Sequence, residues 1–248
     1  LHLMHYFCTK NWIMTKGRLF LIPVPIAEEA TDTIPKQVTD AAFQLKYFVV
    51  ERLKTARRML RSMGYQGDFD SIDLKELDKH ETHIDYRKLL EPALNGSDMG
   101  LMSEAGCPAI ADPGSELVRE AHAQGIQVIP LVGPSSILLA LMSSGMNGQQ
   151  FCFKGYLPYK KGELERSLKQ IEQDSVLRKE TQIFIEAPYR NKSVIEYAVK
   201  VLNPKTQFAV ASELNGVQEF IRSANIGQWK RMKAPDIHKK TAIFLIQA

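Results

Sequence analysis

Hydrophobic positions in the first half of the chain fall in short runs that alternate with stretches of helical periodicity. The runs are rich in β-branched and aromatic residues and predict strands at 18–25, 47–50, 99–103 and 126–132, with a weaker candidate at 71–74. The periodic stretches predict helices that begin near residue 34 and extend over 51–63, 82–95, 114–125 and 135–145. This alternation is typical of a parallel sheet with helices on both faces.

The second half of the chain places its apolar runs closer together. Strands are predicted at 151–158, 181–188 and 207–214, helices at 161–175 and 190–202, and further apolar segments at 216–229 and 240–248. Short turns between adjacent strands favour a mixed, partly antiparallel sheet. We therefore expect two α/β domains that face a cleft, at 17–131 (mostly parallel sheet) and 132–248 (mixed sheet), after an extension at 1–16.

Composition narrows the class of protein. The 248 residues are 44% hydrophobic and 24% charged, which is usual for a soluble protein, and no apolar run approaches the roughly 20 residues that cross a bilayer. Three scattered cysteines argue against a disulfide framework and favour a reducing, cytoplasmic compartment. The first 16 residues lack the pattern of a signal peptide, and we interpret them as an extension ahead of a domain that starts near Met14.

Positive charge is concentrated in two places, although the net charge is only +4. One face of the helix at 51–63 carries Lys54, Arg57, Arg58 and Arg61, opposite an apolar face. A second basic cluster lies at 229–240. A solvated helix face is the plain interpretation of either cluster, but two clusters carry more weight in a protein that handles phosphates.

Two clusters of small residues and prolines follow neighbouring predicted strands, at 103–114 and 132–136. Ligands of parallel sheets bind at the carboxyl ends of the strands, where Gly106 and Gly133 would allow close backbone approach. Ser135 and Ser136 can cap the next helix, whose N–H groups can receive a carboxylate or a ribose hydroxyl. Well-formed turns are the alternative, but two such clusters at adjacent strand ends favour a ligand site.

Other common sites are missing from the sequence. It contains no P-loop, no G-x-G-x-x-G fingerprint and no G-x-S-x-G nucleophile elbow. His80 and His83 lack a further ligand pair, so we predict no metal site. Cys107 has no evident histidine partner and is interpreted as a small packing residue rather than a nucleophile.

The order of several segments resembles that of a known family: LFLIPVPI, SEAGCPAIADPG, QGIQVIPLVGPSS, FCFKGYLP, IFIEAPYR and ASEL. These segments, which span nearly all of 17–248, resemble the tetrapyrrole (corrin/porphyrin) methylase superfamily, and within it most closely the bacterial 16S ribosomal RNA cytidine 2′-O-methyltransferase branch. The resemblance implies a homodimer of two α/β domains, with S-adenosylmethionine as cofactor in the cleft between them.

The resemblance also assigns residues to the cofactor. Those implied to bind S-adenosylmethionine are Pro25, Ala105, Gly106, Cys107, Ile110, Ser135, Ser136, Glu186, Ala211 and Ala242. The chain departs from the family pattern at Ala27, Arg52, Glu104 and Lys240–Thr241. These departures fall mainly where the substrate or the domain hinge would lie, so they bear on substrate identity more than on cofactor binding.

Methyl transfer to a ribose hydroxyl needs alignment of the reactants and a nearby group to take the proton. Glu104 and Glu213 are our candidates for this catalytic role, with a structural cap or hydrogen-bond partner as an equal alternative for each. Arg190 is interpreted either as a substrate-phosphate ligand or as the partner of a neighbouring acid. Arg57, Arg58 and Arg61 complete the predicted substrate-binding set.

Three functions are consistent with these residues. The first is ribose 2′-O-methylation of small-subunit ribosomal RNA, free or in the small ribosomal subunit, which the basic clusters support. The second is methylation of a small molecule such as a tetrapyrrole, whose anionic groups also suit basic residues. The third is a non-catalytic relative that binds RNA or cofactor, suggested by the changes at Ala27 and Arg52.

Overall fold

The computed structural model describes residues 15–77 and 83–248. Most of the predicted N-terminal extension, Cys8 and His80 therefore lie outside the described residues. The chain divides into two compact units, each described by itself below. The first unit comprises residues up to Ile22, Gln37–Glu104 and Pro108–Leu131, and the second comprises Pro23–Lys36, Ala105–Cys107 and Val132–Ala248.

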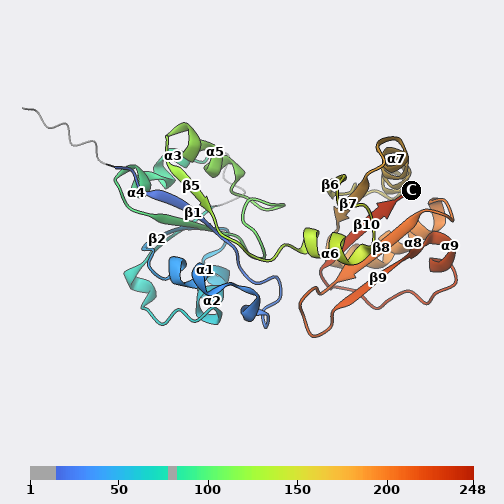
Figure 1. Cartoon of the computed structure of the whole chain (residues 1–248), viewed down its shortest axis with the longest axis horizontal. Helices are drawn as coiled ribbons and strands as arrows, with labels where there is room; N and C mark the ends of the chain where they lie inside the picture. Colours follow the sequence, from blue (N-terminus) through green and yellow to red (C-terminus); the bar gives the residue numbers. More distant parts are fainter. Residues whose placement is uncertain (1–14, 78–82) are drawn as a thin grey trace, which may run out of the picture. The chain divides into compact units, whose positions relative to one another are not determined.

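The first unit is built on a parallel sheet of five strands, in the order β3-β2-β4-β1-β5 (Figure 1). The strands are β1 (Arg18–Ile22), β2 (Tyr47–Val50), β3 (Asp73–Glu76), β4 (Met99–Met102) and β5 (Gln127–Pro130). All four pairings are parallel, as the alternating sequence pattern predicted. The first strand ends at Ile22, because Pro23 has no N–H with which to continue the ladder.

Helices cover both faces of this sheet (Figure 1). They are α1 (Lys36–Ala42), α2 (Leu53–Ser62), α3 (Tyr86–Leu89), α4 (Glu91–Leu94) and α5 (Ser115–Ala123). On one face Leu90 and Leu117 pack with Leu19, Val49 and Leu101 of the strands. The helix predicted at 82–95 is in fact two short helices, because Pro92 fits only the first turn of a helix, where its missing N–H leaves no bond unmade.

The second unit contains a mixed sheet in the order β6-β7-β10-β8-β9. Its strands are β6 (Phe151–Tyr156), β7 (Thr181–Ile185), β8 (Gln207–Ser212), β9 (Phe220–Asn225) and β10 (Ala242–Gln247). β6 and β7 pair in parallel, whereas β10 runs antiparallel to β7 and β8, and β9 antiparallel to β8. The predicted combination of a parallel and a mixed sheet is confirmed.

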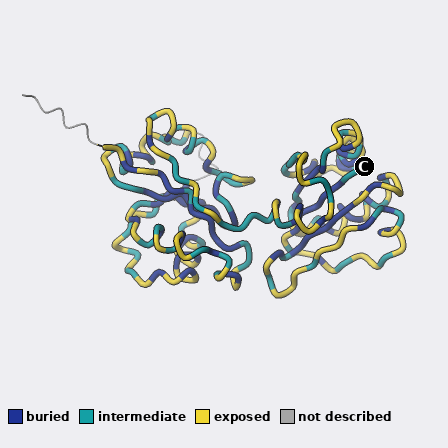
Figure 2. The backbone as a smooth tube through the Cα atoms, viewed as in Figure 1, coloured by how far each residue is buried: buried dark blue, intermediate teal, exposed yellow. Residues whose placement is uncertain are grey.

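This mixed sheet carries helices on both faces, and its central strands are buried (Figure 2). The helices are α6 (Ser136–Ser144), α7 (Lys161–Arg178), α8 (Asn191–Val201) and α9 (Ile226–Trp229). Ile137 and Leu141 of α6 pack on Ala209, Ile243 and Leu245 on one face. On the other face α7, α8 and α9 enclose the stacked rings of Phe184, Phe208 and Phe244. Strand ends are thereby held rigidly in place.

Candidate functional site

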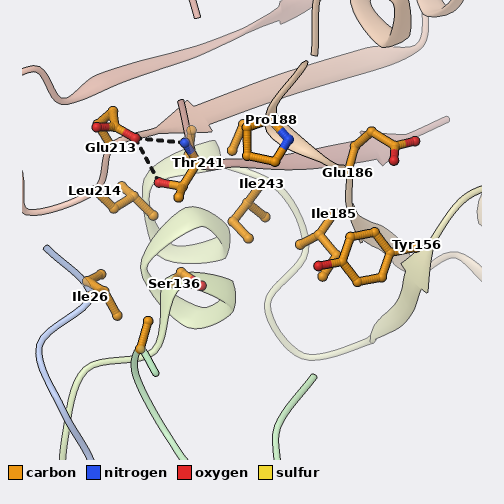
Figure 3. Close-up of a pocket in the computed structure, with 13 residues that line it drawn as sticks. Ile26, Ser136, Tyr156, Ile185, Glu186, Pro188, Glu213, Leu214, Thr241 and Ile243 are labelled. Carbon is orange, nitrogen blue, oxygen red and sulfur yellow. Dashed lines mark hydrogen bonds between the residues drawn. The ribbon is translucent and has the colours of Figure 1, made fainter. Parts of the chain in front are cut away.

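A pocket of about 220 Å³ lies within the second unit, where strand ends of opposite sense meet (Figure 3). Because β10 is antiparallel to its neighbours, its start at Ala242 lies beside the end of β8 at Ser212, and Ile243 lies opposite Ile185 of β7. The lining residues are Ile26, Ala105, Ser136, Tyr156, Ile185, Glu186, Pro188, Ala211, Glu213, Leu214, Thr241, Ala242 and Ile243. Most are apolar, as in ligand pockets generally.

Glu213 is held firmly in the wall of this pocket. Its φ of +50° lies in the left-handed region that residues with a Cβ rarely adopt. Its Oε1 accepts hydrogen bonds from the backbone N–H of Thr241 (2.7 Å) and from Thr241 Oγ1 (2.9 Å), as Figure 3 shows. Its own N–H donates to Thr241 O (3.1 Å). Such an outlier, held by three bonds, points to a site-related role for the carboxylate.

Ala105–Cys107 of the first small-residue cluster and the whole second cluster belong to the second unit, with the segment after β1. Gly106 exchanges two backbone hydrogen bonds with Val24 (3.0 and 3.1 Å), and its φ of +68° suits glycine. A Cβ on Gly133 would lie 2.2 Å from Pro23 Cβ, so only glycine allows this approach. The predicted cap is present, since Ser135 Oγ accepts from Leu138 N at the start of α6.

Cys107 lies between these segments as a partly buried thiol. Its Sγ is 3.4 Å from Pro134 O and donates to it. Burial raises the pKa of the thiol, so the neutral form prevails at physiological pH. Both features agree with the interpretation of Cys107 as a packing residue.

The side chain of Arg190 is largely buried and pairs with Glu186, one of the lining residues. Its side chain is 11% exposed and its Nη1 lies 3.0–3.1 Å from both carboxylate oxygens of Glu186, which is 2% exposed. Its Nη2 donates to Pro158 O (2.9 Å) and Tyr159 O (3.3 Å), and the guanidinium lies over the Tyr159 ring. Of the two interpretations from sequence, these contacts favour pairing with an acid.

The predicted site residues fall into three groups. Those that line the pocket are Ala105, Ser136, Glu186, Ala211, Glu213 and Ala242. Those that lie in the second unit without lining it are Pro25, Gly106, Cys107, Ser135 and Arg190. Those in the first unit are Glu104, Ile110, Arg57, Arg58 and Arg61. Sequence reasoning missed the other lining residues, which are Ile26, Tyr156, Ile185, Pro188, Leu214, Thr241 and Ile243. Most of these adjoin a predicted residue in sequence, whereas Tyr156, at the end of β6, carried no such signal.

Glu104 has partners of its own in the first unit. Its Oε1 accepts from Thr55 Oγ1 (2.9 Å) and lies 3.6 Å from Arg52 Nε. Arg52 and Glu104, two of the departures from the family pattern, are therefore in contact with each other. These contacts support the role of hydrogen-bond partner that the sequence analysis left open for Glu104.

The basic face of α2 is exposed, as predicted, and Ala56, Met59 and Leu60 form its buried face. Its arginines are not equivalent. Arg61 stacks on Phe69 at 4.5 Å and donates to Tyr65 O at 2.6 Å, so it is tied into the fold. Arg57 makes no hydrogen bond or ion pair with the described residues and is available to an anion.

Residues 15–77 and 83–248 offer neither a metal centre nor a membrane span. No group of three or more His, Cys, Asp or Glu side chains in these ranges is placed to hold a metal ion. No helix in the same ranges is long and apolar enough to cross a membrane.

Comparisons with known proteins point to one enzyme class. No family model matches the chain. The ribosomal RNA small subunit methyltransferase I of Escherichia coli O157:H7 is 31% identical over 215 residues, which cover 86% of this chain and 71% of that protein. The protein of the same name from Bacillus subtilis (strain 168) is 30% identical over 207 residues, covering 83% and 67%.

A solved structure shares the fold. The crystal structure of the methyltransferase CobJ superposes with a TM-score of 0.59 and 18% sequence identity, covering 93% of this chain and 94% of that chain. At this identity the likeness speaks to the fold alone.

Proposed function

The chain belongs to the ribosomal RNA small subunit methyltransferase I family, and we propose that it transfers a methyl group from S-adenosylmethionine to a ribose 2′-hydroxyl of small-subunit ribosomal RNA. The observation that carries the proposal is this family membership in a chain whose strand ends build an apolar pocket with a carboxylate in its wall. A homodimer and a cytoplasmic location, which the resemblance and the cysteines suggest, are parts of the same proposal.

The residues of the pocket fit S-adenosylmethionine. Ile26, Ile185 and Leu214 offer apolar contact to a nucleoside base or a thioether chain. Glu213 Oε2 makes no hydrogen bond with the described residues, so it can accept one from a hydroxyl or ammonium group. S-adenosylmethionine carries both groups. The volume, about 220 Å³, is below the roughly 300–1,000 Å³ of typical ligand pockets, so the pocket as described accommodates only part of S-adenosylmethionine.

The residues of the chain serve the reaction mainly by positioning. S-adenosylmethionine supplies an activated methyl group when bound, and small side chains at Ala105, Ala211 and Ala242 keep backbone accessible to it. The acceptor hydroxyl has to lose a proton, and Glu213 and Glu104 stay the candidate acceptors. Arg57 on the exposed face of α2 suits a phosphate of the RNA.

The experiment is a transfer assay with methyl-labelled S-adenosylmethionine and small ribosomal subunits, or their free RNA, from cells that lack this protein. We expect label in the RNA and a single linkage that becomes resistant to alkali, because alkaline cleavage requires a free 2′-hydroxyl. Glu213→Gln tests the pocket carboxylate, with Glu219→Gln, an exposed acid of the same unit, as the matched control.

The outcomes separate the three functions. If the protein binds S-adenosylmethionine and labels an anionic tetrapyrrole but not RNA, small-molecule methylation would replace the proposal. No donor binding by calorimetry at millimolar concentration would leave only a non-catalytic relative.

A further inference from the structure

A basic loop connects α9 to β10. Residues 230–241 contain five lysines and arginines (Lys230, Arg231, Lys233, Lys239 and Lys240) against a single acid, Asp236. The loop therefore has a net charge of +4, equal to the net charge of the entire chain. Such a concentration of one sign, in a chain that is otherwise balanced, attracts a polyanion.

The end of this loop is fixed against the second unit's pocket. Asn191, the first residue of α8, is 0% exposed, and its Nδ2 donates to Ile237 O (2.9 Å) and Lys240 O (2.7 Å). The backbone N–H of Lys239 donates to the carbonyl of Pro188 (3.1 Å), a residue that lines the pocket. The next residue after Lys240 is Thr241, which lines it too. Lys239 and Lys240 therefore stand at the rim of the pocket.

The two lysines are held in place but have no electrostatic partner among the described residues. Lys239 has a φ of +61°, a left-handed conformation in which glycine or asparagine would be less strained. Lys239 is exposed and Lys240 half-buried, and neither ammonium makes a hydrogen bond or ion pair with the described part of the chain. Strained backbone at a ligand site usually has a functional reason.

We propose that Lys239 and Lys240 bind the phosphodiester backbone of the RNA substrate at the rim of the pocket, an inference that rests on the proposed function. Each ribose is flanked by phosphates, so a nucleotide that presents its 2′-hydroxyl to the pocket brings a phosphate to the rim. Lysine ammonium groups suit phosphates of any sequence, because they act as rotatable point charges. The pair orients the RNA and reads no base.

The test is the salt dependence of RNA binding by the double variant Lys239→Gln/Lys240→Gln. Loss of two phosphate contacts should lower the slope of log Kd against log salt by about 1.4–1.8, and weaken binding roughly ten- to thirtyfold near 0.15 M salt. The KM for RNA should rise with kcat nearly unchanged. The Kd for S-adenosylmethionine should stay the same, because the pocket itself is intact.

Three further variants serve as controls. Lys169→Gln/Lys205→Gln removes the same charge from other elements of the second unit and should leave the slope almost unchanged. Lys239→Arg/Lys240→Arg, which keeps both positive charges, should show the slope of the wild-type protein. Lys239→Asn removes one charge and relaxes the left-handed backbone. It should therefore lower the slope by about half as much as the double glutamine variant, without loss of thermal stability.

Each outcome decides the matter. An unchanged slope in the double glutamine variant, with RNA methylation intact in the wild type, would overturn the rim site and leave the proposed function standing. An equal loss in the Lys169/Lys205 variant would also overturn it, since a diffuse field would then explain the binding. A wild-type protein that neither binds nor methylates RNA would overturn both.

Discussion

Replacing Arg190 by alanine should destabilise the second unit strongly. The substitution leaves the carboxylate of Glu186, 2% exposed, without its ion-pair partner, and releases the carbonyls of Pro158 and Tyr159. Removing one partner of a buried ion pair typically costs about 3–5 kcal/mol, because the remaining charge stays desolvated. We expect a loss of that size in the free energy of unfolding, a large share of the roughly 5–15 kcal/mol of an ordinary domain.

The unfolding of this unit can be followed separately. The chain has two tryptophans, and Trp229 is buried in the second unit, where its Nε1–H donates to Phe208 O at 2.8 Å. In a Trp12→Phe background, the fluorescence of Trp229 in urea reports this unit alone. Glu186→Gln should cost less than Arg190→Ala, and Arg190→Met/Glu186→Gln less than the sum of the single changes, since no buried charge is left unpaired.

A loss below about 1 kcal/mol for Arg190→Ala would refute this reasoning, because a pair of such small value behaves as an exposed one. The guanidinium would then be free for the phosphate role that the sequence also allowed. Arg190→Ala protein that stays folded but binds RNA more weakly would assign Arg190 to the substrate.

Four other substitutions test the remaining parts of the molecule. Gly106→Trp should abolish binding of S-adenosylmethionine by calorimetry, because its φ of +68° and a neighbour 3.3 Å from any Cβ leave no room; Cys107→Ser, which keeps a donor for Pro134 O, should bind normally. Arg57→Glu should weaken RNA binding roughly tenfold without changing donor affinity. Asp98→Asn should lower stability by up to about 1 kcal/mol at pH 7. The hydrogen bond from Arg18 lowers the pKa of Asp98 in the folded state, so its contribution is present above the unfolded pKa of about 4 and is lost as pH falls through the folded value. Urea titrations at pH 7 and pH 3 should show the difference shrinking at the lower pH.

The sequence was sufficient to predict the sheets and the loops at their ends. Runs such as Tyr47–Val50 and Thr181–Ile185 are buried on both faces, so continuous apolar character marked them as strands. The division at Pro92 was missed, because periodicity continues across a residue whose effect depends on its place in the turn. The local pattern therefore predicted the elements, and the constraint that Pro92 places on the backbone divided one predicted helix into two.

Long-range pairings could not be predicted in the same way. Glu213 and Thr241 are 28 residues apart, and Arg190 and Pro158 are 32 apart, so neither pair leaves a local pattern. The left-handed backbone of Lys239 is equally hidden, because lysine gives no hint of positive φ. The Glu213–Thr241 contact follows from the register of β8 and β10, and the Arg190–Pro158 contact from the pairing of β6 with β7, which only the folded unit defines.

Glu186 shows why a residue assigned by resemblance still needs its atoms assigned. It follows Ile185 at the end of β7, and successive side chains at a strand end point to opposite faces. In Figure 3 the carboxylate of Glu186 accordingly points away from Ile26 and Ser136, and it binds Arg190. What Glu186 offers the pocket is therefore its backbone, as small residues do at Ala211 and Ala242. It follows that Glu186→Gln, if it folds, should change stability more than donor affinity, whereas Glu213→Gln should do the reverse.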